Sequence, residues 1–190
     1  MKIENIILQL DTAFRGRVIK PSDCITYETE KLFYIEDNEA AGKCITIKQT
    51  VSEEEKQKYF KITNEGTNKV AVWSVDGCFL SSTQNERCDC IFFDENDFCF
   101  VEFKLNATSS NPKTIVQNRI KAVGQLKRMF EFIKNHFNLN HFDFIGYSLE
   151  AYICTPTFYP NKNTAISDFA VEFLEDYGVK LFEKNEKICN

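Results

Sequence analysis

Three ionisable residues interrupt two otherwise apolar segments near the middle of the chain. The stretch 88–104, CDCIFFDENDFCFVEFK, is typical of two strands joined by the turn DEND. Asp89 lies at the start of the first strand, and Glu102 and Lys104 lie at the end of the second. Charged groups are costly inside a sheet unless they are paired or bind a ligand. These three residues are therefore the first candidates for chemistry.

A hairpin closed at residues 94–97 fixes which side chains face one another. This register predicts that Asp89 lies directly across from Glu102, with Cβ atoms about 5 Å apart, and that Lys104 shares their face. The opposite face is predicted to be apolar, formed by Cys88, Cys90, Phe92, Cys99, Val101 and Phe103.

Two carboxylates at this distance destabilise a sheet unless a cation lies between them. One interpretation is a hard divalent cation, because Mg²⁺ and Mn²⁺ bind to one or two carboxylates together with water and phosphate oxygens. The other is structural: Asp89 ends the loop in solvent, and Glu102 pairs with Lys104 or with Arg87. The register alone leaves both interpretations open.

The flanking segments predict an α/β order. Apolar residues recur at helical spacing over 113–137, namely Val116, Ile120, Val123, Phe130, Ile133 and Phe137. We expect a strand over 141–156, a helix over 164–178 and a final strand over 179–184, with helices connecting parallel strands. The earlier part is harder to interpret. Strands are expected over 43–51 and 68–80, and Ser52 three residues before Glu55 predicts a short helix over 52–62.

These residues together resemble the PD-(D/E)xK nuclease superfamily, which has the restriction-endonuclease-like fold of a mixed sheet flanked by helices. The resemblance covers about 70–156 and depends on Asp89, then Glu102-Phe103-Lys104 on the next strand, then the long helix. Cys88 stands where the superfamily's name has proline. The acidic residue that many members supply from an early helix cannot be placed among Glu53, Glu54, Glu55 and Glu65.

The resemblance implies a role for each matching residue. Asp89 and Glu102 would bind Mg²⁺ or Mn²⁺, with the carbonyl oxygen of Phe103 as a further ligand, and Lys104 would position or activate water. The helix segment 122–129, AVGQLKRM, is similar to the superfamily's helix in which a glutamine faces the active site. Gln125 is therefore a fourth candidate catalytic residue.

Charge is distributed unevenly along the chain. The net charge of −5 argues against indiscriminate coating of nucleic acid, which requires many cations. Residues 113–134 nevertheless carry a net charge of +5. The candidate nucleic-acid-binding residues in this segment are Lys113, Arg119, Lys121, Lys127 and Arg128.

The combined expectation is a metal-dependent nuclease that hydrolyses phosphodiester bonds of DNA, with RNA left open as a substrate, in restriction, repair or defence. A chain of 190 residues leaves little room for a separate sequence-reading module, so a homodimer or a targeting partner protein is expected. The alternative belongs to another class: a non-catalytic module of the same fold, of the inhibitor or immunity type, that docks a partner protein through its acidic surface.

Composition also predicts the domain organisation and the location. Sparse glycine and proline predict a single domain over 1–190, with a nuclease core at about 70–156, an N-terminal elaboration and a C-terminal helix and strand. The apolar runs are too short to span a membrane, and the first residues do not resemble a signal peptide, so a cytoplasmic protein is expected. The eight cysteines contain no C-x-x-C pair and are predicted to be free thiols in a reducing compartment.

Overall fold

The computed structural model describes residues 2–49, 51–52, 58–81, 87–105, 107–156, 159 and 164–190. Its helices are α1 (Lys2–Ala13), η1 (Pro21–Cys24, a 3-10 helix), α2 (Pro112–Leu139) and α3 (Thr164–Tyr177). Its strands are β1 (Ile25–Glu28), β2 (Leu32–Asn38), β3 (Lys43–Ile47), β4 (Phe60–Asn64), β5 (Val70–Ser74), β6 (Cys90–Phe93), β7 (Asp97–Phe103), β8 (Ser148–Cys154), β9 (Lys180–Phe182) and β10 (Glu186–Cys189).

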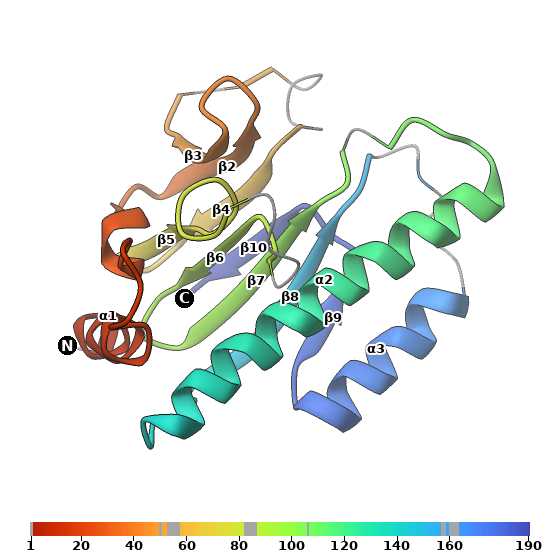
Figure 1. Cartoon of the computed structure of the whole chain (residues 1–190). Coiled ribbons are helices and arrows are strands. Elements are labelled where there is room, and N and C mark those ends of the chain that lie inside the picture. Colours follow the sequence, from red (N-terminus) through yellow and green to blue (C-terminus); the bar gives the residue numbers. More distant parts are fainter. Residues whose placement is uncertain are drawn as a thin grey trace.

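The larger sheet has the order β1-β5-β6-β7-β8-β9 (Figure 1). Its first four strands are antiparallel neighbours, whereas β7, β8 and β9 run parallel. Helices α2 and α3 connect the parallel strands, as crossover connections require. The predicted α/β class and this strand–helix order are confirmed.

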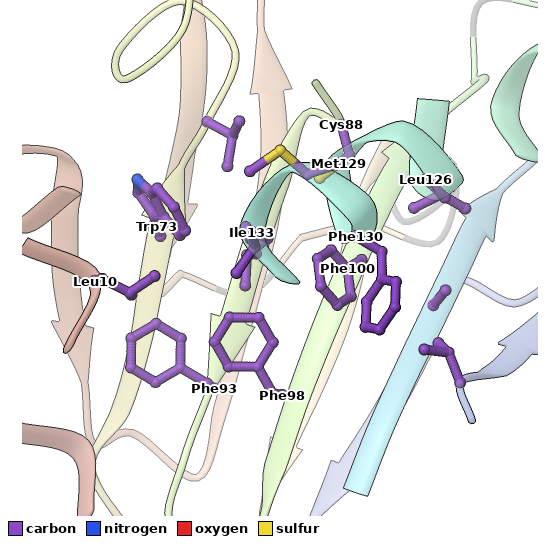
Figure 2. Packing of buried hydrophobic residues seen from close by; sticks show 14 of the residues in the cluster. Leu10, Trp73, Cys88, Phe93, Phe98, Phe100, Leu126, Met129, Phe130 and Ile133 are labelled. Atoms are coloured by element: carbon purple, nitrogen blue, oxygen red, sulfur yellow. The ribbon is translucent and has the colours of Figure 1, made fainter. Parts of the chain in front are cut away.

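Helix α2 begins where the sequence favours a start. Pro112 occupies its first turn, and the side chain of Asn111 accepts a hydrogen bond from the N–H of Lys113 at 3.0 Å. Its apolar stripe packs on the larger sheet, and Phe130 meets Phe100 with ring centroids 5.9 Å apart. Figure 2 shows this layer, with Leu126, Met129, Phe130 and Ile133 of the helix over Phe93, Phe98 and Phe100 of the sheet. Ile120, predicted to belong to this stripe, is instead 52% exposed.

A second sheet covers the other face of the first. Its order is β10-β4-β2-β3, and the residues between the two sheets form a separate apolar cluster. Strands β6 and β7 are consequently buried on both faces: Ile91 and Phe100 point toward the helices, and Cys90 and Val101 point toward the second sheet. The expectation of one polar face is wrong for these strands. Cys88 also lies on the helix side, away from Cys90.

The predicted hairpin register is confirmed over the pairs Cys90↔Val101, Ile91↔Phe100, Phe92↔Cys99 and Phe93↔Phe98. The turn is held by Asp94, whose Oδ1 accepts hydrogen bonds from the N–H groups of Asn96 and Asp97 at 2.7 and 2.8 Å. The regular ladder ends at Cys90, so Asp89 and Glu102 lie just beyond its last pair.

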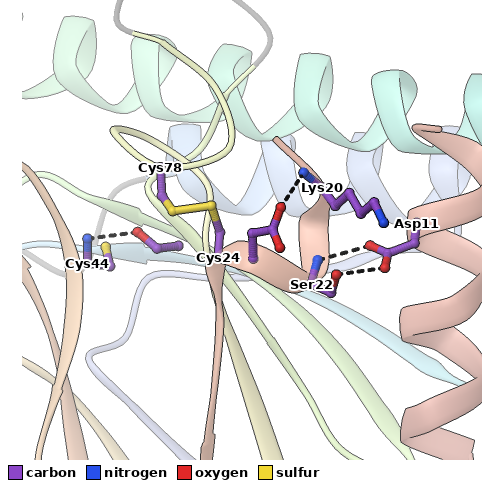
Figure 3. The surroundings of a disulfide bond; sticks show 8 residues. Asp11, Lys20, Ser22, Cys24, Cys44 and Cys78 are labelled. Carbon is purple, nitrogen blue, oxygen red and sulfur yellow. Dashed lines mark hydrogen bonds between the residues drawn. A yellow bond between two sulfur atoms is a disulfide. The ribbon is translucent and has the colours of Figure 1, made fainter. Parts of the chain in front are cut away.

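One disulfide corrects the prediction that all the cysteines are free. Cys24, at the end of η1, is bonded to Cys78 in the turn after β5 (Figure 3). The turn also packs against the β2–β3 connection, because a Cβ on Gly77 would lie 1.7 Å from the carbonyl oxygen of Gly42. The free cysteines among the described residues are all buried: Cys44, Cys88, Cys90, Cys99, Cys154 and Cys189.

Two further expectations can be compared with the structure. The helix predicted over 52–62 is wrong at its end, where Phe60–Asn64 forms β4, and its residues 53–57 lie outside the described residues. Within the described chain, no helix has both the length and the apolar character needed to cross a bilayer.

Candidate active site

Glu102 and Lys104 lie at the carboxyl end of β7. The N–H of Lys104 donates to the carbonyl oxygen of Cys154 at 2.8 Å, which continues the pairing with β8 past the last residue of the strand. Glu102 is 1% exposed, and its Oε1 accepts a hydrogen bond from Lys104 Nζ. Its Oε2 is buried and has no hydrogen-bond partner among the described residues.

Asp89 is fixed by its backbone and by its side chain. Its carbonyl oxygen accepts hydrogen bonds from the N–H groups of Val75 and Asp76 at 3.1 and 3.2 Å, and its own N–H donates to Val101 at 3.1 Å. The carboxylate accepts a hydrogen bond from the N–H of Phe103, next to Glu102. Asp89 was predicted to lie directly across from Glu102. Its carboxylate instead binds the backbone of the neighbouring strand.

Gln125 approaches from α2. Its Oε1 accepts a hydrogen bond from Lys104 Nζ at 3.0 Å. The structure thus brings all four candidate catalytic residues, Asp89, Glu102, Lys104 and Gln125, to one end of the larger sheet. The interpretation that Asp89 is in solvent is wrong, since it is 8% exposed. Of the two structural partners predicted for Glu102, Lys104 forms the ion pair, and Arg87 pairs with Asp76 at 2.9 Å.

Burial dominates the electrostatics of the two carboxylates. It raises the pKa of Asp89 to about 7, against the hydrogen bond from Phe103, and the negative charge of Asp37 acts in the same direction as burial. Burial and then the charge of Asp89 hold the pKa of Glu102 well above its usual range, despite the opposing charge of Lys104. Both side chains therefore resist ionisation. A cation bound between them would stabilise their ionised forms.

The donor set fits a single hard divalent cation. Glu102 offers a buried, unpaired oxygen beside the charge of Asp89. The described residues contain no group of three or more aspartate, glutamate, histidine or cysteine side chains placed to hold a metal. Mg²⁺ needs only one or two carboxylates, because water and phosphate oxygens complete its coordination. The residues present would bind such a cation weakly without substrate.

Asp37 is an acidic residue near this site that the sequence did not reveal. It lies on β2 of the second sheet and lines a cleft of about 980 Å³ together with Lys104. Burial, then the charges of Asp76 and Glu39, raises its pKa. No local pattern marks it, because the contact depends on how the two sheets pack. Among the predicted early acids, Glu65 lies outside the cleft lining, and Glu53, Glu54 and Glu55 lie outside the described residues.

Two hollows flank Lys104 and Gln125. The first, here called the central cleft, is the one with Asp37 and Lys104, and its α2 side carries Thr114 and Asn118. The second, here called the basic hollow, has a volume of about 510 Å³. It is lined by Arg87, Ile120, Lys121, Gly124, Gln125 and Arg128.

The predicted nucleic-acid-binding residues divide into four groups. Lys121 and Arg128 line the basic hollow, and Lys113 is exposed in the first turn of α2. Lys127 pairs with Glu172 of α3 instead of facing the site. Arg119 is a wrong prediction: its side chain is buried and pairs with Glu183 at 2.8 Å, so it cannot reach a phosphate on the surface.

Neither a protein-family model, nor a curated protein, nor a solved structure matches this chain. The functional assignment therefore depends on the geometry of the site.

Proposed function

We propose that this chain is a Mg²⁺- or Mn²⁺-dependent nuclease of the restriction-endonuclease-like type that hydrolyses phosphodiester bonds of DNA. The observation that carries the proposal is the state of Glu102: a 1% exposed carboxylate with one oxygen bonded to Lys104 and the other unpaired among the described residues, next to Asp89. An unpaired buried carboxylate oxygen beside a second carboxylate is a place where a bound cation would be stabilising.

Asp89 and Glu102 would hold the metal ion. When bound, it supplies polarisation of the phosphate and a lower pKa for an attacking water. The backbone contacts of Asp89 fix its carboxylate before substrate arrives, so that little reorganisation is required.

Lys104 would position the nucleophile or stabilise the phosphate charge. Its ammonium has three N–H donors, and Glu102 and Gln125 accept two of them. The third can donate to a water or to a phosphate oxygen. Gln125 is then a positioning residue, since it acts on the reaction through Lys104.

Two features favour a nucleic-acid substrate. The central cleft is open to the surface along α2, where Thr114 and Asn118 offer polar side chains. On the other side of Gln125, the basic hollow supplies positive charge despite the net charge of −5 of the whole chain. Phosphate groups bind where lysine and arginine gather, whatever the charge elsewhere.

The test is cleavage by the purified chain. Plasmid and single- and double-stranded oligonucleotides of DNA and RNA would be incubated with Mg²⁺, Mn²⁺ or EDTA, beside Glu102→Ala and Lys104→Ala. We expect metal-dependent cleavage of DNA that is lost in both variants. Lys134→Ala is the matched control, because Lys134 is exposed on the same helix and lines neither hollow.

The opposite outcome identifies the alternative class. If the wild type and both variants are equally inert with every metal and substrate, the nuclease proposal is wrong and a non-catalytic binding module remains.

A further inference from the structure

The basic hollow has the geometry of an anion site. Lys121, Gly124, Gln125 and Arg128 follow the spacing i, i+3, i+4 and i+7, so they form one continuous stripe on the surface of α2. Arg87 contributes from the segment that leads into β6. Three cations from two separate segments therefore converge on one concave surface.

Gly124 has a specific place in this arrangement. A Cβ at this position would lie 3.2 Å from Nη1 of Arg128, closer than most side-chain contacts. The guanidinium group of Arg128 therefore lies over Gly124, one turn before its own position. The backbone conformation does not require glycine here, so the close approach is what Gly124 provides.

Asp76 neutralises part of the positive charge of the hollow. Its Oδ1 forms an ion pair with Arg87, with Nε of the guanidinium group 2.9 Å away. Lys121 and Arg128 add two further cations to the lining of the hollow. Ile120 also lines it and is 52% exposed, which gives an apolar surface beside the cations.

The hollow is joined to the candidate active site through one side chain. Gln125 lines the hollow and accepts the hydrogen bond from Lys104 Nζ, whereas Lys104 lines the central cleft. A strand that reaches from the cleft past Lys104 along α2 would enter the hollow next. Its backbone would then place a second phosphate among the cations.

We infer that the basic hollow binds a phosphate group adjacent to the one that is cleaved, on the same nucleic-acid strand. This inference rests on the proposed nuclease function and names its substrate class. The substrate is a polynucleotide with successive phosphates, not an isolated phosphodiester. The exposed face of Ile120 contacts the sugar or base attached to that second phosphate.

Binding without catalysis tests the inference directly. The Kd of a fluorescent DNA oligonucleotide would be measured in EDTA by anisotropy, over a range of salt concentrations. We expect Lys121→Ala and Arg128→Ala each to weaken binding about tenfold and to reduce the salt dependence by about one phosphate contact. Lys134→Ala removes the same charge from the same helix outside the hollow and should match the wild type. Circular dichroism would verify that every variant is folded.

Cleavage of two substrates separates this inference from the proposed function. With bis-para-nitrophenyl phosphate, which has one phosphate, Lys104→Ala should lose activity. With an oligonucleotide, the hollow variants should lose about tenfold more activity than they lose on the small diester.

The outcomes differ for the two proposals. If the wild type and the hollow variants bind DNA with equal affinity and equal salt dependence, the inference that the hollow binds a phosphate is wrong, even if DNA is cleaved. Binding that depends on Lys121 and Arg128, with no cleavage of any substrate, would support the hollow and overturn the nuclease.

Discussion

The Nζ atom of Lys104 donates a hydrogen bond to Oε1 of Gln125 at 3.0 Å, and this contact joins the end of β7 to the middle of α2. The same ammonium also donates to Glu102. Lys104 is therefore held by Glu102 of β7 and by Gln125 of α2, which lies 21 residues further along the chain. Its side chain is 21% exposed, so it reaches both the buried carboxylate and the cleft.

Loss of the Gln125 amide should impair the chemistry more than the binding. In Gln125→Ala, Lys104 keeps Glu102 as its partner but loses the contact that directs it toward α2. We expect kcat for oligonucleotide cleavage to fall about 10- to 100-fold, with KM nearly unchanged. Steady-state kinetics would measure this, with Gln117→Ala as the control, since Gln117 is exposed on the same helix. A rise in KM alone would instead assign Gln125 to substrate binding.

Glutamine substitutions of two buried glutamates on neighbouring strands should change the free energy of unfolding in opposite directions. Burial and then the charge of Asp89 raise the pKa of Glu102, so keeping this side chain ionised in the interior of the metal-free protein costs free energy. Glu102→Gln removes that charge. We expect the free energy of unfolding in EDTA to rise by about 1 kcal/mol, or about 2–4 °C in Tm for a chain of this size, while cleavage is lost.

Glu150 on β8 is the matched comparison. Burial raises its pKa, but the hydrogen bonds from Lys187 and Tyr152 outweigh burial and leave the pKa lowered. Lys187 Nζ lies 2.8 Å from its carboxylate and also pairs with Asp97 at 3.1 Å. Glu150→Gln should therefore destabilise the fold, by about 1–3 kcal/mol. Urea denaturation measures both variants, and a loss of stability in both would contradict the account of Glu102.

The sequence predicted the parts of this molecule that depend on local pattern. The turn at Asp94 fixed the hairpin register from Phe93↔Phe98 to Cys90↔Val101. The spacing of apolar residues predicted α2, and the resemblance of segment 122–129 to the superfamily's helix singled out Gln125. Each of these features is encoded within a few residues or a single turn of helix.

The remaining features depend on packing between distant segments. Cys90 and Val101 were correctly placed on one face, but the second sheet that covers them comes from β2, β3, β4 and β10. Asp37 reaches the cleft only because that sheet is there. Arg119 has the same spacing as an exposed helix cation, and its burial depends on Glu183, 64 residues further along the chain.

Metal affinity should fall as pH decreases through about 7. The folded chain holds a proton on Asp89 up to a pKa of about 7, whereas the unfolded chain loses it near 3.8. The metal-free protein therefore loses stability as pH rises from about 4 to about 7, because the unfolded state releases this proton first. A cation must displace the same proton, so Mg²⁺ should bind more weakly at about pH 6 than at about pH 8.

Isothermal titration calorimetry with Mg²⁺ or Mn²⁺ would measure that affinity. Repeating the titration in buffers of different ionisation enthalpy would count the protons released. Asp89→Asn should lose both the binding and its pH dependence. Equal affinity at the two pH values would show that Asp89 is not a metal ligand.

The Cys24–Cys78 disulfide should stabilise both the fold and the active site. It closes a loop with a sequence separation of 54, and reduction would restore the conformational entropy of that loop in the unfolded chain. We expect Cys24→Ala with Cys78→Ala to lower the free energy of unfolding by about 2–4 kcal/mol. The turn held by Cys78 follows Val75 and Asp76, whose N–H groups bind the carbonyl oxygen of Asp89, so cleavage should also decrease.

Urea denaturation and cleavage assays with and without dithiothreitol would measure both effects. Reductant should lower the free energy of unfolding and the cleavage activity of the wild type and leave those of the double variant unchanged. If reductant has no effect on the wild type, the turn is held by its packing alone.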